Sequence, residues 1–215
     1  MAPTIVSAVN IKWKITRMNL PRRFFLLPLF TFLACALPAF STHAHTSHPE
    51  SSTFRAGLLH PFTGLDHLLA MIAVGLWTAQ LGRTARWLVP TAFLVAMLVG
   101  SALATTHTPL PTPESLIATS VLTLGLLIAF ATRLPLFIAS AIVALFALFH
   151  GYVHLTEAPA GSLAQYTAGF TLSTLLLHAI GLTLGLSLSR INQPSILRTC
   201  GAGVALAGIY ICFTI

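Results

Sequence analysis

Long apolar stretches separated by short polar connections dominate the chain after its first 55 residues. A membrane-spanning helix needs about 20 predominantly apolar residues, and an isolated span must satisfy all its backbone groups internally, which favours helices. The sequence therefore predicts an all-α membrane protein, a six-transmembrane-helix bundle over residues 56–215. The predicted spans lie at approximately 56–80, 87–105, 115–132, 134–154, 163–188 and 196–215.

The first 44 residues have the layout of a signal peptide. Five basic residues precede position 24, an apolar run covers 24–37, and small residues lead to Ala44. This order is typical of a secretory leader, so we predict a signal peptide at 1–44 that is cleaved after Ala44. An uncleaved first transmembrane helix is the alternative. Cleavage would leave 45–55 as a short extracytoplasmic segment containing His45 and His48.

Composition agrees with the membrane assignment. The chain of 215 residues is 56% hydrophobic and 7% charged, with a mean hydropathy of +0.88, which excludes an ordinary soluble domain. The formal net charge of +7 does not indicate nucleic acid, because the basic residues are concentrated in the leader or isolated between spans. We expect membrane lipid to surround the protein, and the sequence does not decide between a monomer and a homo-oligomer.

Arginines in the connections predict the orientation. The connections after the first, third and fifth spans are basic, whereas the opposite set contains only Arg55. By the positive-inside rule, the mature N-terminus and the C-terminus both face out of the cytoplasm, across the inner (plasma) membrane. The basic residues are Arg83, Arg86, Arg133, Arg190 and Arg198.

Two groups of ionisable residues interrupt the apolar stretches. The first span carries His60, Asp66 and His67. An aspartate at the centre of a membrane helix costs about 2.5–3.5 kcal/mol on insertion scales, so such groups predict a functional site. The fourth span carries the second group, His150, His154 and Glu157.

The spacing within each group favours a shared metal ion. His150, His154 and Glu157 stand at i, i+4 and i+7, one helical face, and a continuous first span would also place His60 and His67 on one face. Both groups are expected in the outer half of the membrane. Other interpretations stay open: histidines that join helices by hydrogen bonds, an Asp66 that only orients a histidine, and an interfacial Glu157.

Two further residues in the spans could contact an ion. His178 lies about the middle of the fifth span among threonines and serines, and we predict that it lines the inward part of a path, with packing as the alternative. Met71 stands four residues after His67, but a single buried methionine usually fills space. The donors, imidazole and carboxylate, suit Ni²⁺, Co²⁺ or Zn²⁺ rather than Cu⁺.

Both motifs resemble those of a known family. The segment 60–77, which begins His60-Pro61-Phe62-Thr63-Gly64-Leu65-Asp66-His67, is similar to the first-helix signature of the HupE/UreJ family of nickel and cobalt permeases. His150-Gly151-Tyr152-Val153-His154 with Glu157 resembles its second motif, although Leu155 stands where that motif usually has glycine. The resemblance extends to Pro90, Met97, Gly100, Glu114, Ser120 and Leu177-His178-Ala179.

The resemblance implies a six-helix secondary permease that supplies nickel to hydrogenase or urease, with Ni²⁺ or Co²⁺ as transported ion, no prosthetic group and no enzymatic activity. A divalent cation that enters a negative interior gains about 4.6 kcal/mol at 100 mV, and the chain has no phosphate-binding glycine loop. The rivals are an intramembrane metal-dependent hydrolase with a histidine-bound Zn²⁺ and a metal-sensing accessory protein.

Overall fold

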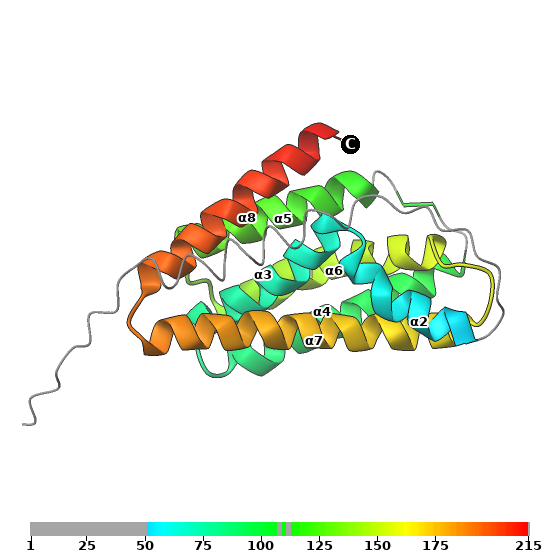
Figure 1. The fold of residues 1–215 in the computed structure, drawn as a ribbon, viewed down its shortest axis with the longest axis horizontal. Helices are drawn as coiled ribbons and strands as arrows, with labels where there is room; N and C mark the ends of the chain where they lie inside the picture. Colours follow the sequence, from blue (N-terminus) through cyan, green and yellow to red (C-terminus); the bar gives the residue numbers. More distant parts are fainter. Residues whose placement is uncertain (1–50, 107–108, 111–112, 215) are drawn as a thin grey trace, which may run out of the picture. The chain divides into compact units, whose positions relative to one another are not determined.

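The computed structural model describes residues 51–106, 109–110 and 113–214. These residues are helical with short connections, as predicted (Figure 1). The predicted leader at 1–44 and the histidines at 43, 45 and 48 lie outside the described residues. The helices are α2 (Ser51–Leu59), η2 (His60–Phe62), α3 (Leu65–Leu81), α4 (Ala85–Ala104), α5 (Pro113–Ala129), α6 (Leu136–Thr156), α7 (Leu163–Arg190) and α8 (Pro194–Thr214).

Length and hydropathy make the chain a multi-pass membrane protein. Four helices, α4, α6, α7 and α8, are long and apolar enough to cross a bilayer. A fifth span results if α2, η2 and α3 are taken as one bent crossing. The 17 residues of α5 extend only about 26 Å, slightly less than the ~30 Å hydrocarbon core. The predicted count of six is therefore not reached by helix length alone.

The first predicted span is broken rather than continuous. Its two halves, Thr53–Phe62 and Leu65–Leu81, meet at an angle of 76°. Pro61 has no backbone N–H to continue the helix, and Gly64 is extended, with φ −106° and ψ 124°. The expectation that His60 and His67 share one face of a continuous first span is therefore wrong.

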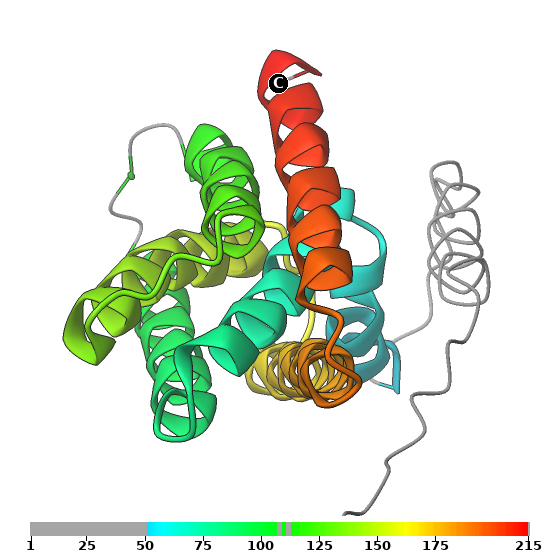
Figure 2. The ribbon, with the colours of Figure 1, turned by 90° about the vertical axis from the view of Figure 1, so that its left-hand side faces the viewer.

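Helix α3 lies at the centre of the bundle. All 13 residues from His67 to Ala79 are buried, and α3 contacts every other helix from α4 to α8. Helix α2 packs on α7, α4 on α6, and α5 on α8; Figures 1 and 2 both show α5 and α8 side by side. Because α3 is enclosed on all sides, its polar side chains necessarily point into protein rather than lipid.

Glycines allow the closest helix contacts. A Cβ at Gly75 of α3 would clash with the backbone of α7 near His178, and a Cβ at Gly151 of α6 would clash with the carbonyl of Met97 in α4. Small residues at membrane helix interfaces let backbones approach in this way. The approach brings α3 against α7 and α4 against α6, which are the four helices that line the interior described below.

Candidate metal site

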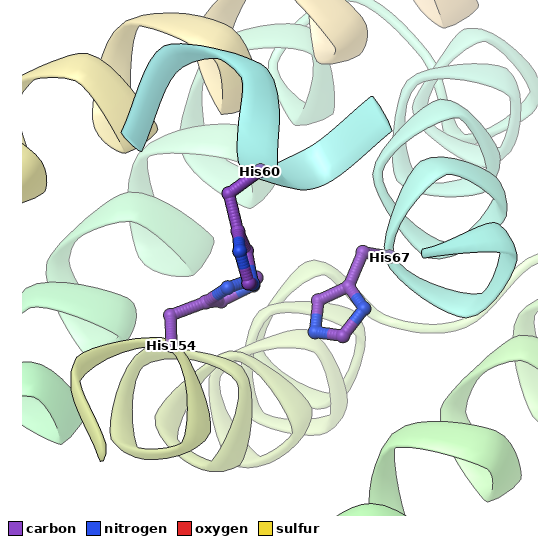
Figure 3. Close-up of side chains that lie close together, drawn as sticks. All are labelled: His60, His67 and His154. Carbon is purple, nitrogen blue, oxygen red and sulfur yellow. The ribbon is translucent and has the colours of Figure 1, made fainter. Parts of the chain in front are cut away.

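Three imidazoles meet at the end of the bundle where α3 begins and α6 ends. One ring nitrogen from each of His60, His67 and His154 lies within 4.8 Å of the other two. His60 is in η2, His67 in the first turn of α3 and His154 near the end of α6, and their rings converge from these three elements (Figure 3). Within the described residues, this is the group of side chains arranged to hold a metal ion.

Asp66 fixes the orientation of His67. Its Oδ1 lies 2.7 Å from His67 Nδ1 and accepts the His67 backbone N–H at 2.8 Å. The pair leaves His67 Nε2 buried and without a hydrogen-bond partner in the described structure. This contact fits a partner that orients His67, one of the two roles open from sequence, and it would leave Nε2 as the nitrogen that faces an ion.

A glycine makes room for this pair. A Cβ on Gly64 would stand 2.7 Å from both Asp66 Oδ1 and His67 Nδ1, which is closer than side chains tolerate. The glycine in the first motif thus has two functions, since it breaks the span and leaves space for the carboxylate–imidazole contact.

His154 is the most enclosed of the three ligand candidates. Its side chain is 0% exposed, and neither ring nitrogen has a hydrogen-bond partner in the described part of the chain. Leaving a buried polar group unsatisfied costs roughly 1–3 kcal/mol. A metal ion shared with His60 and His67 would supply the missing interaction, and three neutral imidazoles suit the borderline ions Co²⁺, Ni²⁺ and Zn²⁺.

Glu157 contacts a histidine instead of joining the three-histidine group. Its Oε2 lies 3.4 Å from His60 Nε2, and the residue caps α6 in a half-exposed position. The hydrogen bond with His60 lowers the pKa of Glu157, so the carboxylate is kept ionised at the rim. A negative charge there attracts cations and positions His60.

His150 lies one turn deeper than His154 and outside the group. Its Nδ1 bonds with the Phe146 carbonyl at 2.9 Å, while its Nε2 is buried without a partner in the described structure. The ring centroids of His150 and His154 are 6.3 Å apart, because i, i+4 spacing separates them by one turn along the bundle. His150, which the sequence assigned to the same shared site as His154, therefore lies outside the three-histidine group, and its role as a ligand stays a prediction.

His178 lies deeper still. The centroid of its ring lies 4.8 Å from the ring centroid of Phe93. The Phe93 centroid in turn lies 5.7 Å from that of His150. Both nitrogens of His178 are buried without a partner in the described residues. The structure thus separates the sequence candidates into an outer group and two deeper histidines joined through Phe93.

Helix α7 forms a wall beside these histidines, of which the sequence predicted only the inner part around His178. Tyr166 stacks edge-on against His60 at 5.9 Å, and Phe170 lies 3.8 Å from His154 between ring centroids. Thr174 and His178 continue the same face, since the four residues are spaced by four. That spacing of one aromatic, hydroxyl or imidazole group per turn was the signal available from sequence.

The chain is similar to known proteins over most of its length. The sequence model of a family described as HupE / UreJ protein matches residues 32–211. Protein HupE of Rhizobium leguminosarum bv. viciae is 45% identical over 181 residues, which are 83% of this chain and 93% of that protein. No solved structure matches the chain significantly.

Proposed function

Because the chain belongs to the HupE/UreJ family, a family generally associated with nickel and cobalt transport, we propose that it is a secondary permease for a divalent transition-metal ion, Ni²⁺ or Co²⁺. The observation that carries the proposal is the convergence of His60, His67 and His154 inside a membrane bundle, where His67 Nε2 and both His154 nitrogens have no hydrogen-bond partner in the described structure. The family assignment also confirms the resemblance seen in the two sequence motifs.

The arrangement of the site supports capture from one end. His60 and Glu157 are the more exposed members, so the ion meets a carboxylate and an imidazole first. His67 and His154, both buried, then replace water molecules of the ion. Three ligands do not complete the sphere of a six-coordinate ion, which leaves the ion free to exchange ligands and move on.

Beyond the cluster, His150 and His178 offer further nitrogens toward the opposite end of the bundle. The membrane potential supplies the driving force, about 4.6 kcal/mol for a divalent ion at 100 mV. Uptake therefore needs no nucleotide. We include in the proposal the role predicted for His178 from the sequence, in which it lines the inward part of the ion's path.

Uptake into intact cells tests the proposed function. Cells that express the chain should accumulate Ni²⁺ or Co²⁺ several-fold above control cells at submicromolar metal, and dissipating the membrane potential should reduce the uptake. Accumulation is measured by mass spectrometry of cell metal for Ni²⁺, Co²⁺, Zn²⁺ and Mn²⁺ in parallel. Absence of accumulation for all four ions would reject transport and leave the metal-dependent hydrolase as the interpretation to test.

The proposed direction requires the histidine cluster to face out of the cytoplasm. Arg83, Arg133 and Arg190 lie in or beside connections at the other end of the bundle, so we propose that this end is cytoplasmic. A reporter active only in the cytoplasm should work when fused after Arg190 and fail when fused after Thr106 or at the C-terminus. The reverse pattern would place the cluster on the cytoplasmic side and contradict uptake by this route.

A further inference from the structure

Two methionine sulfurs face one threonine hydroxyl in the interior of the bundle. Thr174 Oγ1 of α7 lies 3.4 Å from Met71 Sδ of α3 and 3.7 Å from Met97 Sδ of α4. All three side chains are 0% exposed. Met71, which its sequence position indicated as a space-filling residue, is thus joined at this polar atom by a second thioether from another helix.

The hydroxyl has only one proton for three acceptors. Thr174 Oγ1 also donates to the Phe170 carbonyl at 3.0 Å, and a carbonyl oxygen is a better acceptor than a thioether sulfur. When the hydroxyl donates its proton to the hydrogen bond with the Phe170 carbonyl, the hydroxyl oxygen and the two sulfurs face one another with lone pairs only. Such a group is complementary to a cation.

The three residues lie one turn deeper than the outer cluster. Met71 follows His67 by four residues on α3, and Thr174 follows Phe170, the neighbour of His154, by four on α7. Four residues further along α7 is His178. The donor groups are therefore stacked in levels along the bundle, first the three outer histidines, then the two sulfurs and the hydroxyl, then His178.

We propose that Met71, Met97 and Thr174 form a second, thioether-containing binding site for the transported ion between the outer histidines and His178. The proposal rests on the proposed transport function. Ligands about 2.0–2.3 Å from a tetrahedral ion are roughly 3.3–3.8 Å apart, which matches the two oxygen–sulfur distances. Neutral thioethers are soft ligands, so the site holds the borderline ions Ni²⁺ or Co²⁺ only weakly and rejects the hard ions Mn²⁺ and Mg²⁺.

The test measures Ni²⁺ bound to the purified full-length chain in lipid nanodiscs by equilibrium dialysis. The wild type should bind two ions. The double variant Met71→Leu/Met97→Leu, which removes sulfur with little change in volume, should bind one and transport at least tenfold more slowly. Thr174→Val should have the same effect by a separate route. Ile117→Leu, an equally buried exchange on α5, is the control and should change neither quantity.

The variant His67→Ala/His154→Ala isolates the inner site. It should still bind one Ni²⁺, and nickel X-ray absorption should show sulfur ligands that disappear when Met71→Leu/Met97→Leu is added. A wild type that binds no Ni²⁺ would reject the proposed function itself. Binding of one ion that is abolished in His67→Ala/His154→Ala and unchanged in the methionine and Thr174 variants would overturn the second site alone.

Discussion

Replacement of His154 by alanine is expected to remove nearly all Ni²⁺ uptake while the protein remains folded in the membrane. Metal binding by four protein ligands is worth about 10–16 kcal/mol, or roughly 3 kcal/mol per ligand, so one lost imidazole weakens capture about a hundredfold. The substitution breaks no side-chain hydrogen bond, because neither His154 nitrogen has a hydrogen-bond partner in the described structure. Initial uptake rates and the amount of membrane-inserted protein are the two measurements.

The shared site also predicts a non-additive double variant. Once His154→Ala has opened the cluster, adding His67→Ala should cost little more, because residues that act as one unit do not lose function independently. Thr78→Val is a matched control, since Thr78 is a fully buried polar residue of α3 whose hydroxyl donates to the Gly75 carbonyl of its own helix. Mild single effects that multiply in the double variant would instead indicate separate structural histidines.

Much of the fold was accessible from the sequence because membrane helices require long apolar runs. The six apolar stretches correspond to helices, and most predicted bounds differ from the observed ones by a few residues. The end of α5 was placed too late: the helix stops at Ala129 because Ala131 adopts a left-handed backbone with φ 51°. Hydropathy alone does not register this turn, since Phe130 and Ala131 are apolar.

The break in the first span near His60 was harder to predict from the sequence, although residues that interrupt helices stand there. Pro61 and Gly64 are residues that interrupt helices, yet they lie within an apolar run that reads as one span. The consequence concerns the site directly. A straight helix would separate His60 and His67 by two turns, whereas the bend brings the two ring centroids within 5.7 Å.

The composition of the site required tertiary contacts that no single motif contains. The two motifs identified His60, His67 and His154, but their spacing gave no reason to separate His154 from His150. The bend of one segment and the packing of α3 against α6 decide which histidine faces the cluster. The contact of Met97 with Thr174 was not predictable for a similar reason, because one methionine or one threonine per helix is unremarkable until helix packing brings them together.

Asp66→Asn is expected to weaken Ni²⁺ binding by about 10- to 100-fold, the usual effect of changing a partner that orients a metal-binding histidine. The amide keeps an oxygen for the His67 backbone N–H but removes the charge that polarises His67 through Nδ1. Binding is measured by calorimetry on the purified chain. If Asp66 were itself a ligand, the loss would equal that of His67→Ala, and nickel X-ray absorption would show one oxygen ligand fewer.

A double variant decides whether Asp66 acts only through His67. In a His67→Ala background the carboxylate has lost the imidazole that it orients, so Asp66→Asn should have almost no further effect on Ni²⁺ affinity. Asp66 also lies in the first turn of α3, where an acid stabilises the helix by about 0.3–1 kcal/mol. This stabilisation of α3 is measured by thermal unfolding without metal, and it should be the same with His67 present and in the His67→Ala variant. A tenfold affinity loss that survives the removal of His67 would show that Asp66 contacts the ion directly.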